Sequence, residues 1–128
     1  MKKFLSIIAF LFICVVTYAE NATLTIRNNS ERTLTIKVMK SSGGVYQTVF
    51  IGPRNSRIVN FYQSGYFYTK VKAERNQFDT MYSKGEVFYI QNDNRGYSEN
   101  ELTFTIIESK YPQSSGERIS KSEFEKDN

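Results

Sequence analysis

Two tyrosines and two lysines alternate along one predicted strand, and their chemistry suits ligand binding. The segment 66–73 reads YFYTKVKA, and successive side chains of a strand point to opposite faces. One face would therefore carry Tyr66, Tyr68, Lys70 and Lys72. Tyrosine rings can stack on a sugar or dock a side chain of a partner, and lysines can bind a carboxylate or a sulfate. We predict that these four residues form an exposed binding stripe.

The opposite face of this strand, with Phe67, Thr69, Val71 and Ala73, is expected to point into a core. The stripe itself would also suit the solvated side of an ordinary sheet, because tyrosine favours strands and lysine stems shield neighbouring surface. A register slip of one residue would bury the tyrosines instead. Both alternatives remain open at the level of sequence.

The segment 92–101 is dense in side-chain oxygen atoms and resembles a calcium loop in composition. If Gly96 is placed at the sixth position of the EF-hand pattern, Arg95 falls at a ligand position, where a cation would repel calcium. We predict no metal site and interpret the segment as a polar connection between strands. Its acidic residues Glu99 and Glu101 would also suit the contact loop of a small inhibitor with a basic target.

The composition argues against catalysis. The chain has no histidine, which excludes serine–histidine and cysteine–histidine nucleophiles and histidine-ligated metals. Two acidic pairs, Glu74 with Asp79 and Glu99 with Glu101, would hydrolyse a glycoside only if held about 5–10 Å apart across a cleft. A small sandwich offers little room for such a cleft, and adjacent Ser-Lys pairs lack the S-x-x-K spacing. We predict no enzymatic activity and no cofactor.

Residues 1–19 have the three parts of an export signal: a basic start, an apolar run over 4–16, and small residues at Thr17 and Ala19. The apolar run is shorter than the ~20 residues that span a bilayer. Cys14 lacks the small preceding residue of a lipoprotein signal. Cleavage would remove this single cysteine, so we expect a domain without disulfides that is exported to the periplasm or cell surface, with no stable membrane insertion.

Export would also change the charge of the chain. The whole sequence has 17 Lys and Arg against 13 Asp and Glu, a net charge of +4. Loss of Lys2 and Lys3 leaves 15 basic residues against 13 acidic ones, a net charge of +2 for residues 20–128. So small a charge gives little general attraction to nucleic acid, and we predict no nucleic-acid partner. The Lys-Lys start and the lysine- and asparagine-rich body are typical of a bacterial envelope protein.

Seven segments have the period-two alternation or the β-branched and aromatic content of strands. They are 23–27, 33–38, 45–51, 57–62, 66–74, 86–91 and 102–108. Every glycine and proline lies between these segments or at their edges, and the domain contains no long amphipathic run. This pattern predicts an all-β domain over 20–112: a single antiparallel β-sandwich of about seven strands, immunoglobulin-like or transthyretin-like in outline, or alternatively a small β-barrel.

Two further segments are expected to be irregular. Residues 75–84 show no clear alternation. Residues 113–128 are rich in Ser, Glu and Lys, with Ile119 and Phe124 as their only apolar members. That composition predicts a flexible polar tail, with a transient helical turn near Glu123.

Together these features predict an exported, non-catalytic binding module of the bacterial cell envelope, with a glycan or a protein as ligand. Tyr62 or Tyr82 could extend the predicted stripe. One alternative is a small inhibitor or immunity-type protein that acts through the 92–101 loop. Another is a structural subunit that assembles through an exposed edge strand. The module is expected to be a monomer or a weak oligomer.

Overall fold

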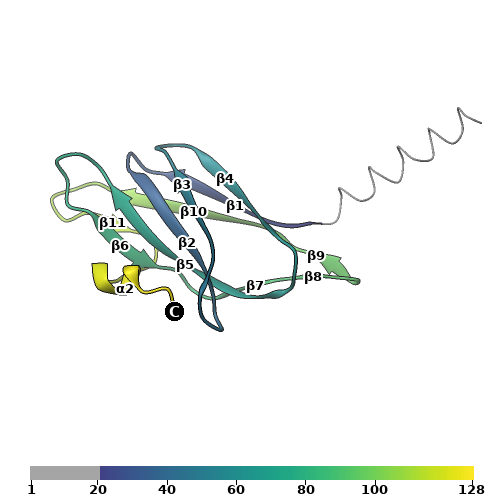
Figure 1. The fold of residues 1–128 in the computed structure, drawn as a ribbon. Helices are drawn as coiled ribbons and strands as arrows, with labels where there is room; N and C mark the ends of the chain where they lie inside the picture. Colours follow the sequence, from purple (N-terminus) through teal and green to yellow (C-terminus); the bar gives the residue numbers. More distant parts are fainter. Residues whose placement is uncertain (1–20) are drawn as a thin grey trace, which may run out of the picture.

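The computed structural model describes residues 21–128, and the predicted export signal lies outside them. The described chain forms twelve strands and one short helix (Figure 1). Their bounds are β1 Ala22–Asn29, β2 Thr33–Lys40, β3 Val45–Ile51, β4 Ser56–Phe61, β5 Gly65–Glu74, β6 Met81–Lys84, β7 Phe88–Ile90, β8 Asn92–Asp93, β9 Gly96–Tyr97, β10 Glu99–Ile107, β11 Gln113–Ser114, β12 Glu117–Arg118 and α2 Lys121–Glu125.

Two sheets pack face to face as a sandwich (Figure 1). Sheet A has the strand order β11-β10-β1-β4, and sheet B has the order β12-β6-β5-β2-β3, with β7 also paired to β5. The described strands do not close into a barrel, so the predicted sandwich is confirmed and the small-barrel alternative is wrong. Among the ladders of residues 21–128, β1 with β10 is parallel and the others are antiparallel.

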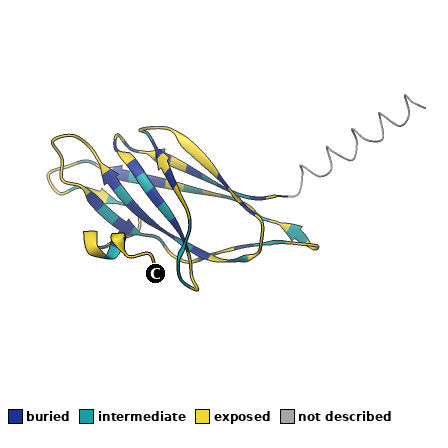
Figure 2. Cartoon of the chain, in the orientation of Figure 1, coloured by how far each residue is buried: buried dark blue, intermediate teal, exposed yellow. Residues whose placement is uncertain are grey.

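The core lies between the inward faces of the two sheets, and it follows the alternation of the sequence (Figure 2). In β1 and β2 every second residue is buried, because period two turns alternate side chains to opposite faces. The predicted inward set of β5 is also buried: Phe67, Thr69, Val71 and Ala73. Tyr46, Phe61 and Phe67 pack their rings together at one end of this core, with centroids 4.8–5.3 Å apart.

The prediction of an irregular stretch over 75–84 is wrong at its end, where β6 forms. Met81 and Ser83 of β6 point inward and are buried. Because one of these two inward residues is a serine, the sequence of β6 lacks the apolar alternation that predicts a strand. β6 and β7 pair with successive parts of β5, and Gly85 lies between them. The N–H of Gly85 donates to the carbonyl of Thr69 at 2.9 Å, and a Cβ there would lie 2.9 Å from Oγ1 of Thr69. Glycine therefore permits this close approach.

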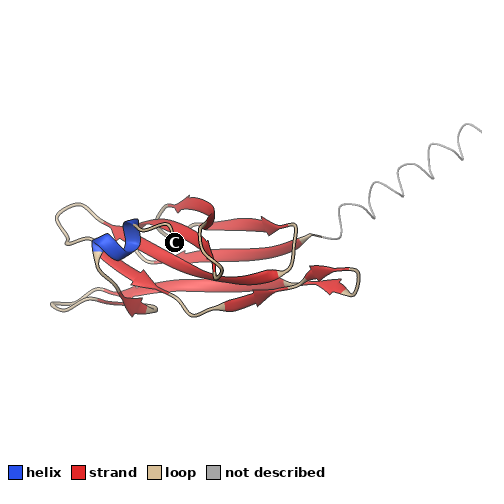
Figure 3. Ribbon diagram, turned by 60° about the horizontal axis from the view of Figure 1, so that its bottom comes forward, coloured by secondary structure: helices blue, strands red, loops and turns tan. Residues whose placement is uncertain are grey.

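The segment 113–128, expected to be a flexible tail, instead forms regular structure, and the helical turn expected near Glu123 is present in α2. β11 pairs with β10 of sheet A, and β12 pairs with β6 of sheet B, so this segment crosses between the sheets along one side of the sandwich. Gly116 makes the turn between them at a φ of +83°. The helix α2 follows and lies across the outside of sheet B (Figure 3). Within the described residues, no helix has the length and apolar character needed to cross a membrane.

A buried polar cluster closes one end of the sandwich, in the connection from β1 to β2. Arg32 is 1% exposed, and its guanidinium donates to the carboxylate of Glu108 at 3.1 Å and to the carbonyl of Asp79 at 2.6 Å. The side-chain amide of Asn28 donates to the carbonyl groups of Arg32 and Gly52. These bonds satisfy buried main-chain carbonyls that the strand ladders leave unpaired.

Candidate functional site

The four residues of the predicted stripe lie on the outer face of β5, but they differ in exposure. Tyr66 is 58% exposed, whereas Tyr68 and Lys72 are half-buried and Lys70 is fully buried. Nζ of Lys72 lies 3.7 Å from the carboxylate of its neighbour Glu74. The alternation therefore places the four side chains on one face as expected, but the expectation that all four are exposed is wrong at Lys70.

The helix α2 covers Lys70. Its ammonium group donates to the main-chain carbonyls of Glu123 and Lys126, at 2.7 and 2.8 Å. The C-terminal segment was expected to be a flexible tail, so its packing over β5 was not predicted. The strand order adds a second lysine, since Lys37 of β2 is the cross-strand partner of Lys70.

Lys37 holds the same segment from the neighbouring strand. Its ammonium group donates to the carbonyl of Phe124 and to the carboxylate of Asp127, both at 2.9 Å. It also lies 4.6 Å from the centroid of the Phe124 ring. Three strands and one helix thus meet in a cluster that we call the lysine site: Lys37, Lys70, Tyr82 and the segment 119–128 that covers them.

The environment of Lys70 lowers its pKa below the ordinary value of 10.5. Burial is the largest cause, because the charged form loses its hydration. The carboxylates of Glu123 and Asp127 act in the opposite direction, whereas Lys37 and Lys84 lower the pKa further. Hydrogen bonds to two carbonyls therefore stabilise the charged ammonium group, whereas desolvation and the charges of Lys37 and Lys84 destabilise it.

Tyr82, one of the two possible extensions of the stripe, does belong to this face. It is the cross-strand neighbour of Lys72 on β6, and its ring packs against Phe124 with centroids 5.5 Å apart. Tyr62 instead follows β4 of sheet A and is highly exposed. The structure therefore brings Tyr82 into the lysine site and places Tyr62 just after the edge strand of the other sheet.

The exposed part of the outer face lies at the other end of β5, around two tyrosines. Tyr66 and Tyr89 are cross-strand partners on β5 and β7, with ring centroids 4.9 Å apart and an interplanar angle of 53°. Tyr89 is 45% exposed. A pair of packed rings that remain open to solvent offers aromatic surface at little entropic cost, because each ring holds the other in place. Tyr89 was missed in the sequence because its pairing with β5 is not local.

The polar connection 92–101 is not a loop throughout. β8 and β9 form a short hairpin that extends beyond the end of the sandwich (Figure 1), and β10 already begins at Glu99. The carboxylate of Asp93 accepts from the N–H of Arg95 at 2.8 Å, and this bond is the main cause that lowers the pKa of Asp93 below 3.8. Glu101 pairs with Arg27 at 3.0 Å on the outer face of sheet A. Glu101 therefore belongs to a strand and its charge is paired, whereas a contact role of the connection 92–101 stays a prediction.

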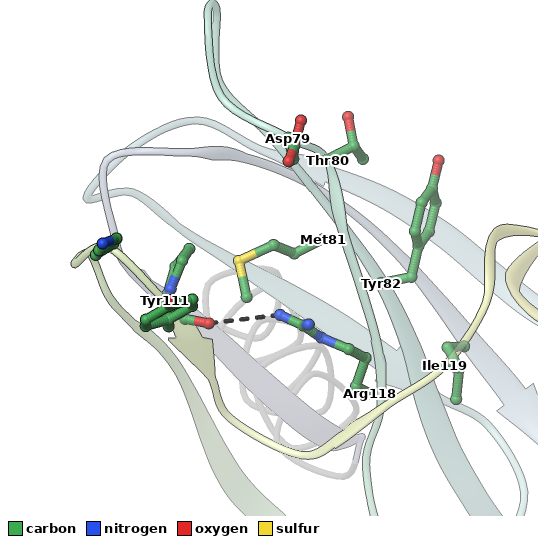
Figure 4. A pocket seen from close by; sticks show the side chains of 9 residues that line it. Asp79, Thr80, Met81, Tyr82, Tyr111, Arg118 and Ile119 are labelled. Carbon is green, nitrogen blue, oxygen red and sulfur yellow. Dashed lines mark hydrogen bonds between the residues drawn. The ribbon is translucent and has the colours of Figure 1, made fainter.

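A pocket of about 430 Å³ opens beside β6, under the connection that precedes β11. Figure 4 shows Met81, Tyr111 and Arg118 around it. Arg118 donates to the carbonyl of Pro112 at 3.4 Å. The charged side chains that line this pocket are exposed, namely Asp79, Lys110 and Arg118. It therefore offers no desolvated charge that would fix the orientation of a ligand.

Among residues 21–128, no group of three or more His, Cys, Asp or Glu side chains is placed to hold a metal ion. Two of the four acidic residues that could have acted in pairs are engaged with basic residues, Glu74 with Lys72 and Glu101 with Arg27. The arrangement can bind carbonyl and carboxylate oxygens at the lysine site and apolar or sugar surface at Tyr66 and Tyr89.

Comparisons of the chain with protein-family models, with curated proteins and with solved structures give no match.

Proposed function

We propose that this protein is an exported, non-catalytic binding module of the bacterial cell envelope, with a glycan or a protein as its ligand. The contact surface is the exposed end of the outer face of sheet B, centred on Tyr66 and Tyr89. The observation that carries the proposal is this solvent-open pair of packed tyrosines. Of the predicted stripe, Tyr66 remains available and Tyr68 follows it on the same face, whereas Lys70 belongs to the lysine site. Lys72 lies beyond Lys70, beside Tyr82.

The charge and the sequence of the chain support the same function. The N-terminal pattern of a basic start, an apolar run and small residues is that of an export signal. The small net charge expected after cleavage does not favour a polyanion as ligand. Aromatic rings supply binding surface for either a sugar ring or a partner side chain without a strong charge.

A glycan array probed with the purified protein tests the proposal. We expect a saccharide or a set of related saccharides to bind, and Tyr66→Ala and Tyr89→Ala each to weaken that binding at least about tenfold, the scale of one lost aromatic contact. Tyr111→Ala is the matched control, because Tyr111 is a highly exposed tyrosine on another surface. A blank array would exclude the glycan, and pull-down from envelope extract with the same variants would then test a protein ligand.

An inhibitor that acts through the β8–β9 hairpin is a second proposal, supported by the projection of this hairpin beyond the sandwich (Figure 1). Arg95 at its tip is the most exposed charged side chain of the hairpin, so this reading requires an acidic rather than a basic target. Arg95→Ala would abolish inhibition under this reading and would leave the glycan array unchanged.

Assembly through an edge strand is a third proposal, and it would involve β3 or β4 on the side opposite the C-terminal segment. The carbonyl of Asn60 on β4 accepts from the hydroxyl of Tyr46, and the carbonyl of Phe50 on β3 accepts from Arg57. A second chain that pairs with β4 would have to displace the Tyr46 hydroxyl, and one that pairs with β3 would have to displace Arg57. Sedimentation at rising concentration tests this proposal: a single monomer species would contradict it.

A further inference from the structure

We propose that the lysine site is a binding site for acidic peptide segments that carry an aromatic residue, and that the C-terminal segment 119–128 occupies it within the same chain. The aromatic residue enters beside Tyr82, and the main-chain carbonyls of this residue and its near neighbours in the segment accept from the two ammonium groups. This inference does not depend on the ligand of Tyr66 and Tyr89, because the two sites share no residue.

Recognition of the backbone carries the first part of the argument. Lys37 and Lys70 together donate to the carbonyl groups of Glu123, Phe124 and Lys126. These carbonyls lie at the carboxyl end of α2, where the helix has no internal partner for them and where the helix dipole is negative. Positive groups placed there satisfy the free carbonyls and the dipole together. The pair of lysines thus recognises the end of a helical turn.

The aromatic residue provides the second part. Phe124 is 5% exposed although the segment around it is polar. Its ring lies against Tyr82 and under the ammonium group of Lys37, an arrangement that gains from both aromatic packing and cation–π attraction. Phe124 is not part of the core cluster between the sheets. The segment therefore packs on the outer face of the sandwich and is not part of the core between the sheets.

The charges explain why this face needs a ligand. Lys37 and Lys70 are directly opposite on neighbouring strands, and like charges in that position repel each other. Asp127 offsets this repulsion by pairing with Lys37 at 2.9 Å, and Glu123 acts on Lys70. A ligand with carbonyl and carboxylate oxygens at the same positions would offset it equally well.

The attachment of the segment is limited to a few contacts, so it can be exchanged. The helix has five residues, begins at the cap Ser120, and buries one side chain. Segments with few buried contacts open at a lower free energy than the core. A separate peptide must still compete with a tethered one, whose effective concentration is in the millimolar range, about that of a short flexible linker. Binding in trans should therefore become visible when the tethered segment is weakened.

The test uses the full chain with Phe124→Ala and an unlabelled peptide of sequence ISKSEFEKDN, which corresponds to residues 119–128. Amide spectra of the isotope-labelled protein report binding through shifts on β2, β5 and β6. We expect half-saturation at a peptide concentration at least about tenfold lower for Phe124→Ala than for the wild-type chain. The same peptide with alanine in place of phenylalanine should give no saturable shifts.

The variant Lys70→Met in the Phe124→Ala background locates the site, because it removes two hydrogen bonds to carbonyls and should abolish saturation by the peptide. Arg27→Met is the matched control on the outer face of sheet A and should leave binding intact. Absence of peptide binding to a folded Phe124→Ala chain, or binding that survives Lys70→Met, would overturn the proposal. If Phe124→Ala does not fold, the site is part of the domain's stability rather than exchangeable, and the proposal is equally overturned.

Discussion

Lys37 of β2 and Lys70 of β5 stand directly opposite each other in sheet B, and both donate hydrogen bonds to main-chain carbonyls of the C-terminal segment. Two lysines from strands far apart in the sequence thus hold the last residues of the chain on the outside of the sandwich. The burial of the Lys70 ammonium group also makes the stability of the protein depend on pH.

Lys70 should make the free energy of unfolding rise with pH in the alkaline range. Its pKa is lowered in the folded protein, mainly by burial, and is 10.5 in the unfolded chain. Between those two pKa values the unfolded chain binds more protons, so raising the pH favours the folded state; below the folded pKa the full penalty is present. We therefore expect the wild-type chain to gain stability relative to Lys70→Met as the pH is raised toward 10.5, in urea unfolding at intervals from pH 7.

The control for this measurement is Lys72→Met, on the same strand and face but partly exposed. This variant shows, at each pH, what the loss of a partly exposed lysine from the same face does to stability. A stability difference between Lys70→Met and the wild-type chain that does not change with pH would contradict the predicted titration of Lys70. The charges that face Lys70 are those of Glu123, Lys37, Asp127 and Lys84, so the ionic strength must be held fixed.

Arg32→Met should lower the free energy of unfolding by about 3 kcal/mol, because it removes the buried member of an ion pair and leaves Glu108 only its longer contact with Arg75, at 3.6 Å. Arg32 is 1% exposed, and the change would also free the carbonyls of Ala73 and Asp79. Arg27→Met offers a comparison at the same pair distance, about 3.0 Å, but on the surface, and it should lower stability by less than about 1 kcal/mol. Equal losses in urea unfolding would show that burial of the pair does not decide its contribution.

Gly116→Ala should loosen the segment that joins the two sheets. Both Gly116 and Gly43 have positive φ, but a Cβ on Gly116 would lie 2.7 Å from the carbonyl oxygen of Lys84, whereas one on Gly43 meets nothing within 4 Å. Gly43→Ala should therefore lower stability by about 1 kcal/mol through backbone strain alone. Gly116→Ala should lower the free energy of unfolding by at least about 1 kcal/mol more than Gly43→Ala does, because the backbone at Lys84 must move to make room for the Cβ.

Hydrogen exchange gives the local measurement for this pair of variants. Amides of β11 and β12 should lose protection in Gly116→Ala and keep it in Gly43→Ala. Retained protection in both variants would mean that the turn between the sheets tolerates a Cβ.

The β8–β9 hairpin should become less ordered at low pH, where Asp93 is protonated. Its pKa is lowered below 3.8 mainly by the N–H of Arg95 and next by the side chain of Gln91. The stabilisation is thus present above about pH 3.8 and is lost as the pH falls through the lower folded pKa. The amide proton shift of Arg95 should report this transition. Asp93→Asn should remove the transition, and a wild-type shift that is flat down to pH 2 would contradict the prediction.

Much of the fold could be predicted from local pattern. The alternation in β1, β2 and β5 identified both the strands and their inward residues, because a strand must turn successive side chains to opposite faces. The placement of glycines marked the turns, as at Gly43 with its φ of +115°. Prediction was weakest where polar residues occupy regular structure, as Ser83 does in β6 and Glu99 does in β10.

The site was harder to predict because it depends on pairings between distant segments. The sequence by itself determined that Tyr66, Tyr68, Lys70 and Lys72 share one face, since that follows from their spacing along one strand. Only the tertiary structure decided which of them stay exposed: the pairing of β2 with β5 sets Lys37 beside Lys70, and the pairing of β12 with β6 returns the C-terminal segment to this face. The segment 119–128 has too few apolar residues to fold alone, and the hydrogen-bond donors and aromatic surface that hold it belong to strands far away in the sequence.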